Sequence, residues 1–194
     1  MNEANLPMQT APLSDTLAEW LADEAALFAR QREHQQPPSG GVVAAAQAKE
    51  LSGLQQLKRM IAGEAPAPPI AYTMDFWLIR VAEGEAVFQG RPLFKHYNPL
   101  GGVHGGWFAT VLDSALGCAV HSTMQVGERY TTLELKLNLV RGLQEGQPQR
   151  VRAIGRVRHR GRQMASAEAD LVGPDGKLYA HASTTCLVFS GVRP

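Results

Sequence analysis

The sequence lacks most of the features that mark specialised classes of protein. Its 194 residues include only two cysteines, Cys118 and Cys186, which stand far apart in apolar stretches and predict neither a disulfide framework nor a metal site. No apolar run approaches the roughly 20 residues of a membrane span. The net charge of +1 and the 19% of charged residues show no imbalance typical of nucleic-acid-coating or disordered chains. These absences predict a soluble globular protein.

Targeting and cofactor motifs are also missing. The opening stretch "MNEANLPMQTAPL" has no basic start and no continuous apolar segment, so we expect a cytoplasmic protein without a membrane partner. The histidines form no HExxH pattern, and no P-loop, GxGxxG or GxSxG motif occurs. The sequence therefore predicts no metal and no bound cofactor.

Two clusters of proline and glycine, at 36–41 and 63–69, divide the chain. Before the first, apolar residues recur at helical spacing and predict an amphipathic helix over 14–34. A second helical stretch lies over 43–62, and Ser52-Gly53 is expected to break or start it. The proline clusters should interrupt both helices.

After Pro69 the pattern changes to short runs rich in β-branched and aromatic residues, separated by turn residues. The expected strands cover 72–81 and 85–92 around a hairpin at Glu83-Gly84, then 131–140, 150–159, 163–172 and the final run 177–190. One helix, over 105–123, lies among them. This pattern predicts an α+β domain with about six strands around one helix. We divide the chain into a helical extension and linker over 1–50 and a main domain over 51–194.

The run 131–140, "TTLELKLNLV", has the clearest strand pattern because it alternates without a fault. One expected face carries Leu133, Leu135, Leu137 and Leu139, and the other carries Thr132, Glu134, Lys136 and Asn138. We expect the leucine face to pack on an apolar element and the other face to meet solvent, a ligand or another subunit.

The expected helix over 105–123 has one continuous apolar stripe. The stripe consists of Phe108, Val111, Leu112, Ala115, Leu116, Ala119 and Val120. The opposite side carries the small or polar residues Thr110, Ser114, Gly117 and His121, which suggests that this side is also covered and makes another subunit a candidate. Asp113 falls outside the stripe, and a lone carboxylate in these surroundings is unusual.

Two glycines, Gly105 and Gly106, begin this helix. Each costs about 1 kcal/mol relative to alanine, and no Ser, Thr, Asp or Asn stands immediately before them as a cap. Backbone N–H groups without side chains can approach a ligand oxygen closely, at the positive end of the helix dipole. The pair therefore predicts an oxyanion site. Asp113 lies about two turns away and would need a long substrate or a second chain to share that site.

The joint spacing of these residues resembles a known family. The pattern is Asn98, Gly101, "HGG" at 104–106, Asp113 nine residues after the histidine, and Thr132 at the start of an alternating strand. It resembles the hotdog-fold acyl-CoA thioesterases, and most of all their phenylacetic-acid-degradation type. The resemblance covers about 51–190. It implies a curved antiparallel sheet wrapped around one long helix, with each active site at the interface of a dimer or of a dimer of dimers.

The resemblance implies a role for each matching residue. Asp113 matches the catalytic carboxylate, which acts as general base or as nucleophile. Gly105 matches the residue whose N–H polarises the thioester carbonyl, and Gly106 allows close packing. Because the sites form between subunits, Asp113 of one chain would face the Gly105 amide of the other.

Three further positions match residues that arrange the reacting groups. Asn98 and His104 match positions that orient the thioester and the attacking water. Thr132 stands where the family often has a hydroxyl residue that holds the nucleophile, with Thr131 as the alternative register. We also expect Trp107, with Phe108 and Met124, to line the acyl tunnel, although the sequence does not define the acyl group.

Six arginines crowd two expected strands and their turn: Arg150, Arg152, Arg156, Arg158, Arg160 and Arg162. One interpretation is a solvated sheet edge whose charge prevents edge pairing. The other is a cationic rim, with Arg158 and Arg160 at its centre, for the phosphates of coenzyme A. Nucleic acid fits less well because the rest of the sequence is near neutral and no aromatic residues are interleaved with the patch.

Three functions remain open from the sequence. The first is hydrolysis of an acyl-CoA thioester, in which coenzyme A is part of the substrate. The second is a non-catalytic acyl-CoA sensor, against which the presence of Asp113 argues. The third is a hotdog hydratase or dehydratase, whose signature places a histidine about three residues after the Asn, whereas His104 follows Asn98 by six.

Overall fold

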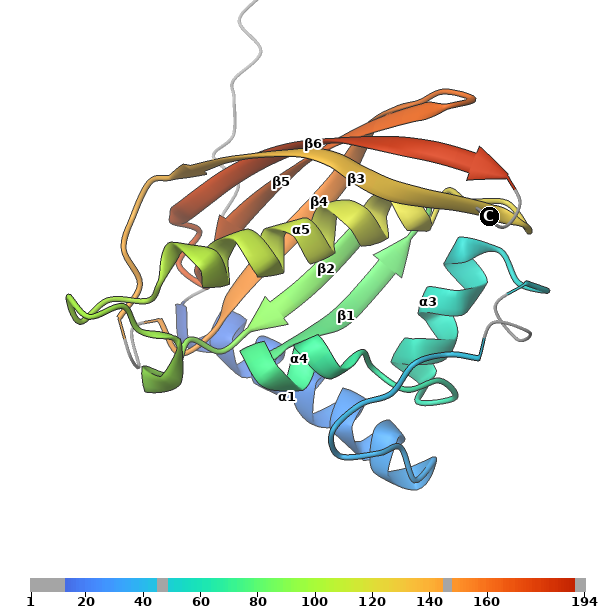
Figure 1. The fold of residues 1–194 in the computed structure, drawn as a ribbon. Coiled ribbons are helices and arrows are strands. Elements are labelled where there is room, and N and C mark those ends of the chain that lie inside the picture. The colour runs from blue at the N-terminus through green and yellow to red at the C-terminus, as the bar shows by residue number, and fades with distance from the viewer. Residues whose placement is uncertain (1–12, 45–48, 145–147, 191–194) are drawn as a thin grey trace, which may run out of the picture.

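A computed structural model describes residues 13–44, 49–144 and 148–190 (Figure 1). In chain order the elements are α1 (Leu13–Glu33), α3 (Gly53–Ala62), α4 (Pro69–Met74), β1 (Phe76–Ala82), β2 (Glu85–Gly90), the 3-10 turn η1 (Phe94–His96), α5 (Gly105–His121), β3 (Glu128–Leu139), β4 (Val151–Arg160), β5 (Met164–Val172) and β6 (Leu178–Ser190). The predicted α+β class is confirmed.

The six strands form one antiparallel sheet in the order β1-β2-β4-β5-β6-β3. The sheet curves over α5, the long central helix (Figure 1). Strands β1 and β3 are the two edges of the sheet. The hairpin predicted at Glu83-Gly84 is present, with Ala82 opposite Glu85. This is the hotdog arrangement that the sequence predicts.

The core lies between α5 and the concave face of the sheet. Every residue of the predicted apolar stripe of α5 is buried, with exposed fractions of 2% or less. The helix approaches β4 so closely that a Cβ on Gly155 would lie 2.3 Å from the carbonyl oxygen of Ala115. Gly155 therefore allows this contact between helix and sheet.

Strand β3 differs from the predicted alternation because it contains a bulge. Its register against β6 shifts between Thr132 and Glu134, which makes Leu133 a bulge. The bulge reverses which side chains face the helix, because side chains alternate with period two. Thr132 consequently faces α5 rather than the outer side, whereas Leu133 is 60% exposed. Farther along, Leu139 is 54% exposed but still faces the start of α5, because a Cβ on Gly105 would lie 3.3 Å from its Cδ1. The predicted face of four leucines is therefore wrong only at Leu133.

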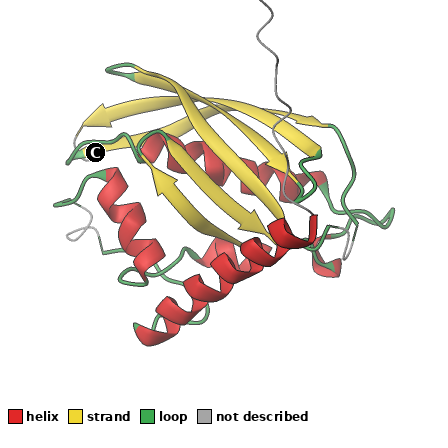
Figure 2. Ribbon diagram, turned by 180° about the vertical axis from the view of Figure 1, so that it is seen from behind, coloured by secondary structure: helices red, strands yellow, loops and turns green. Residues whose placement is uncertain are grey.

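The N-terminal helix α1 packs against the outer face of the sheet, on the side opposite α5 (Figure 2). Gln89 of β2 donates a hydrogen bond to the carbonyl oxygen of Trp20 and another to Glu24. Glu24 also accepts two hydrogen bonds from Arg150, at 2.7 and 2.8 Å. The guanidinium of Arg152 stacks over the ring of Trp20, 4.5 Å from its centroid. The predicted extension is thus docked on its own domain through buried polar contacts.

The segment before β1 also differs from the prediction. Residues 69–74 form the short helix α4 rather than the start of a strand, because Pro69 occupies a helical N-terminal position and Asp75 ends the helix in a left-handed conformation. Of the two roles predicted for Ser52-Gly53, the start of a helix is confirmed: Ser52 caps α3 with a capping box that includes Gln55. The predicted helix over 43–62 is too long, because residues 43–44 and 49–51 are not helical. Residues 45–48 of the predicted second helix lie outside the described residues.

Candidate functional site

The candidate carboxylate, Asp113, lies in the middle of α5 on the side that faces β3. It is half-buried, and the hydroxyl of Thr132 donates a hydrogen bond to its Oδ1 at 3.3 Å. Burial raises the pKa of Asp113, and the hydrogen bond from Thr132 opposes part of that rise. The result is a partly desolvated carboxylate held in place by a neighbouring strand.

The bulge in β3 decides which threonine reaches Asp113. Because Leu133 takes up the extra residue, Thr132 points toward α5. No hydrogen bond joins Thr131 to Asp113 in the described residues. Of the two registers that the sequence leaves open, the structure places Thr132 beside the carboxylate.

The N-terminus of α5 is capped by a histidine. Nδ1 of His104 accepts a hydrogen bond from the amide of Gly106 at 2.8 Å. When neutral, an imidazole that accepts at Nδ1 carries its proton at Nε2, from which it can donate to a ligand. Within the part of the chain that the structure describes, the amide of Gly105 has no hydrogen-bond partner. One glycine amide is therefore satisfied by the cap and the other is left as a donor.

Asn98 lies in the turn that precedes this helix. Its Oδ1 accepts hydrogen bonds from the amides of Leu100 at 2.9 Å and of Gly102 at 3.3 Å. Its backbone amide donates to the carbonyl oxygen of Gly102. The side-chain oxygen thus holds the loop, and the Nδ2 group makes no hydrogen bond to the described residues.

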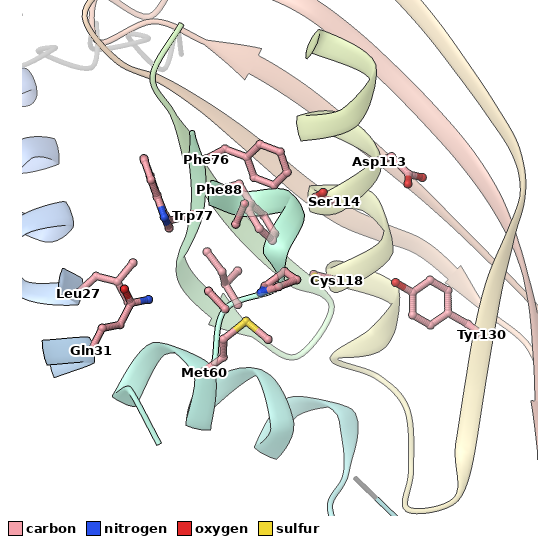
Figure 3. Close-up of a pocket in the computed structure, with 14 residues that line it drawn as sticks. Leu27, Gln31, Met60, Phe76, Trp77, Phe88, Asp113, Ser114, Cys118 and Tyr130 are labelled. Carbon is pink, nitrogen blue, oxygen red and sulfur yellow. The ribbon is translucent and has the colours of Figure 1, made fainter. Parts of the chain in front are cut away.

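A cavity of about 210 Å³ opens beside Asp113 (Figure 3). Figure 3 shows Ser114 and Cys118 of α5 between Asp113 and the aromatic side chains of β1 and β2. The cavity is lined by Leu27, Gln31, Met60, Ala67, Pro68, Ala71, Phe76, Trp77, Leu78, Phe88, Asp113, Ser114, Cys118 and Tyr130. Most of these side chains are apolar, so the cavity suits an apolar group attached to something that reacts at Asp113.

This cavity passes around the free edge of β1. Phe76 and Leu78 belong to the core beneath α5, whereas Trp77 between them belongs to the second core under α1. Helices α3 and α4 cover the strand edge and contribute Met60 and Ala71. The cavity therefore reaches from the α5 side of the sheet to the α1 side.

A second cavity, of about 390 Å³, lies at the N-terminal end of α5. It is lined by Met74, Lys95, His96, Tyr97, His104, Gly106, Trp107 and Thr110. It places the imidazole of His104 and the positive end of the helix at one surface. Within one chain, the two ends of the site lie about 12 Å apart along the helix axis, because Asp113 follows Gly105 by eight residues.

The predicted substrate-binding arginines are engaged in ion pairs. Arg158 pairs with Glu168 at 2.6 Å, and Arg160 pairs with Glu128 at 2.6 Å. The arginine cluster is therefore divided, because Arg150 and Arg152 hold α1 as described above. The interpretation of the cluster as a solvated sheet edge is wrong, because β4, which carries most of these arginines, pairs with β2 on one side and with β5 on the other.

The sequence did not identify the residues that line the cavity beside Asp113. Phe108 and Met124, expected in the acyl tunnel, are buried in the main core, and neither lines this cavity. Trp107 lines the second cavity instead, and its Nε1 donates to the carbonyl oxygen of Met74 at 2.7 Å. The continuous apolar run of Phe76, Trp77 and Leu78 is the signal that could have indicated a strand covered on both faces.

The opposite side of α5 is covered partly by the chain itself. The hydroxyl of Tyr130 lies so close to Gly117 that a Cβ there would be 2.6 Å away. His121 makes a 3.3 Å hydrogen bond with Gln56 of α3. Another subunit is therefore not needed to cover this end of the helix. Among the described residues, no helix is long and apolar enough to cross a membrane, and no cluster of His, Cys, Asp and Glu could hold a metal ion.

Comparison with known proteins identifies relatives of this fold. The model of the thioesterase superfamily matches residues 100–180. A phenylacetic acid degradation-related protein of Ralstonia eutropha JMP134 is 32% identical, with a TM-score of 0.61, over 68% of this chain and 98% of that one. A thioesterase family protein of Silicibacter pomeroyi is 23% identical, with a TM-score of 0.62, over 72% and 99% of the two chains. The PaaI protein of the E. coli phenylacetic acid degradation operon is 20% identical, with a TM-score of 0.63, over 72% and 96%. No curated protein sequence matches the chain.

Proposed function

Because the chain belongs to the hotdog thioesterases of the phenylacetic-acid-degradation type and is therefore a thioester hydrolase, we propose that its substrates are acyl-CoA thioesters and that Asp113 carries the reaction. The observation that carries this proposal is the position of Asp113: a partly desolvated carboxylate, hydrogen-bonded to Thr132, at the edge of an apolar cavity. A thioester with its carbonyl at Asp113 and its acyl group in the cavity uses both features.

In the proposed reaction Asp113 acts as general base toward water. Its carboxylate takes a proton from the water as the oxygen attacks the thioester carbon, and the resulting tetrahedral intermediate expels coenzyme A as a thiolate, which then takes up a proton. Burial raises the pKa of Asp113 and so makes its carboxylate a stronger base than that of an exposed aspartate. Direct attack by the same carboxylate is the alternative, and incorporation of ¹⁸O from labelled water into Asp113 during a single turnover would identify it.

We assign the oxyanion to the amide of Gly105. This amide is the donor at the N-terminus of α5 that has no partner among the described residues, and the helix dipole favours negative charge there. The Nε2–H of His104 and the Nδ2 of Asn98 are the groups proposed to orient the thioester and the water. Gly106 keeps the helix start free of side chains.

The site is proposed to form between two subunits. The rise of about 12 Å between Gly105 and Asp113 is too long for both to act on one carbonyl group within one chain. The edge strand β3 supports such an interface because it exposes Leu133 and Leu139, and Val140, which follows the strand, is exposed as well. A two-fold pairing would bring Asp113 of one chain to Gly105 of the other. A dimer, or a dimer of dimers, is accordingly the proposed state.

The proposed reaction needs no separate cofactor, because coenzyme A is part of the substrate. Arg158 remains the proposed phosphate contact because its ion pair with Glu168 is largely exposed, with 62% of the Arg158 side chain accessible. Exposed ion pairs contribute little, so a phosphate can replace the carboxylate at little cost. Arg160 is more enclosed, and its contribution is proposed to be smaller.

Thiol release from a panel of acyl-CoA thioesters, followed with Ellman's reagent, tests the proposal. We expect hydrolysis by the unmodified protein and a loss of at least about a hundredfold in kcat for Asp113→Ala. Asp170→Ala is the matched control, because it makes the same change on β5, where Asp170 pairs with His181 and lines neither cavity. Equal activity of Asp113→Ala and the unmodified protein would remove Asp113 from the reaction.

A further inference from the structure

The far end of the cavity beside Asp113 is more polar than its middle. Gln31, from α1, is only 6% exposed, and Trp77, from β1, is only 5% exposed. Both line the cavity, together with Leu27 (Figure 3). Polar side chains buried this deeply are normally hydrogen-bonded, so their partners need to be accounted for.

Trp77 has no partner for its one polar atom. Its Nε1–H is buried and makes no hydrogen bond to any described residue. The ring itself is fixed because Phe28 of α1 packs edge-on against it at 5.0 Å between centroids. In Figure 3 the nitrogen lies at the end of the indole nearest Leu27. A buried donor left unpaired costs about 1–3 kcal/mol, which a ligand acceptor would recover.

Gln31 presents a second donor. Its Oε1 accepts a hydrogen bond from the hydroxyl of Tyr72 at 3.3 Å, which assigns the other amide atom as the Nε2 donor. Within the described residues, Nε2 makes no hydrogen bond. The far end of the cavity therefore presents two donors, Trp77 Nε1 and Gln31 Nε2.

The charge of the lining limits what these donors can bind. None of the residues that line the cavity is Lys, Arg or His, and the one charged group is Asp113 at the opposite end. A carboxylate at the far end would be desolvated without a counter-charge, which is costly. A neutral carbonyl oxygen only accepts hydrogen bonds, so two donors are all that it requires from the protein.

We propose that this thioesterase selects acyl groups that carry a neutral carbonyl oxygen at the end remote from the thioester, and that Gln31 of the N-terminal helix and Trp77 recognise that oxygen. The inference rests on the proposed function. The cavity volume limits the size: an apolar cavity of about 150 Å³ holds benzene, so about 210 Å³ suits a chain of medium length or a single substituted ring. The selecting wall includes α1, which lies in the predicted extension over 1–50.

The test compares octanoyl-CoA with its ω−1 oxo analogue on the full-length protein. We expect kcat/KM to be roughly tenfold higher for the oxo substrate, as one or two hydrogen bonds in a buried site would give. Gln31→Met and Trp77→Phe should each lower this ratio several-fold while keeping the shape of the wall. Thr73→Val is the control: it removes a hydroxyl from the neighbouring helix α4, where that group bonds only to the carbonyl oxygen of Pro69 and does not line the cavity, and it should keep the ratio.

Three results would overturn the proposal. They are equal kcat/KM for the two substrates, a ratio unchanged in both Gln31→Met and Trp77→Phe, and a preference for the ω-carboxylate analogue. Calorimetric titration of the Asp113→Ala variant with both acyl-CoAs measures the same selectivity without hydrolysis. Selective binding without turnover of any thioester would count against the proposed hydrolysis of acyl-CoA but support the recognition by Gln31 and Trp77. Hydrolysis without selectivity would support the hydrolysis and overturn the recognition.

Discussion

At the residue scale, the hydrogen bond between Thr132 and Asp113 connects the strand bulge with the chemistry. A donor to the ionised carboxylate favours the charged form, so its loss raises the pKa of Asp113 further above the ordinary range. A general base must be ionised, and activity therefore falls as pH decreases through this pKa. The contact also fixes the direction in which the carboxylate points.

Thr132→Val should move the acidic limb of the kcat/KM profile to higher pH and lower kcat at neutral pH roughly tenfold, because orientation is lost. Thr131→Val is the matched control: it makes the same chemical change one residue earlier, where no hydrogen bond reaches Asp113. The measurement is the pH dependence of thiol release for both variants. A shift in Thr131→Val and none in Thr132→Val would show that the other register operates in solution.

The sequence predicted the positions of most candidate site residues but not how each is satisfied. None of the usual capping residues Ser, Thr, Asp and Asn precedes Gly105-Gly106, but His104 caps the helix through Nδ1. The predicted position of Thr132 on the outer face is wrong because the bulge at Leu133 reverses the alternation of side chains. No single residue of "TTLELKLNLV" indicates that bulge. Both depend on contacts between segments that local patterns do not encode.

At the element scale, helix α1 is held by a buried charge network in addition to the apolar contacts of Leu27 and Phe28. The helix was predicted from its spacing, but the sequence could not say what it covers. Its partners Gln89 and Arg150 lie on strands that are distant in sequence. Arg150 belonged to a cluster for which an exposed edge and a phosphate rim were equally reasonable, and its role became clear only from the fold.

Glu24→Gln should lower the free energy of unfolding by about 3 kcal/mol at neutral pH, because it leaves the guanidinium of Arg150 enclosed without its counter-charge. Burial alone would raise the pKa of Glu24, but the hydrogen bonds from Arg150 and Gln89 and the charge of Arg150 outweigh it and hold the pKa below its usual range. The stabilisation is therefore complete above the unfolded-state pKa and is lost as pH falls through the lower folded-state pKa.

Urea denaturation at neutral and acidic pH, followed by tryptophan fluorescence, measures this effect. Glu33→Gln, an exposed change at the end of the same helix, is the control and should leave stability within about 0.5 kcal/mol. The difference between Glu24→Gln and the unmodified protein should shrink in acid. A difference that stays constant from neutral to acidic pH would exclude Glu24 as the titrating group.

At the scale of the whole molecule, the six-strand sheet and its central helix follow from patterns in the sequence, because period-two runs and one apolar stripe specify both. The cavity does not follow from them. It arises where α1, α3 and α4 together cover the free edge of β1, and residues such as Leu27, Met60 and Phe76 meet only in the folded chain. Patterns within one element cannot predict a space that several elements enclose together.

Mixing two inactive variants tests whether the site is shared between chains. Asp113→Asn removes the base, and Gly105→Pro removes the proposed oxyanion donor. Proline is tolerated at the first helical position, and His104, with φ −63° and ψ 138°, already has the conformation that proline requires of its predecessor.

If each site pairs Asp113 of one chain with Gly105 of the other, a mixed dimer has one site with both defects and one intact site. Co-refolding equal amounts should therefore restore about a quarter of the activity of the unmodified protein, since half of the dimers are mixed. Each variant refolded alone is the control, and circular dichroism checks that Gly105→Pro keeps its fold. No recovery from two folded variants that exchange subunits would place both groups of each site in a single chain.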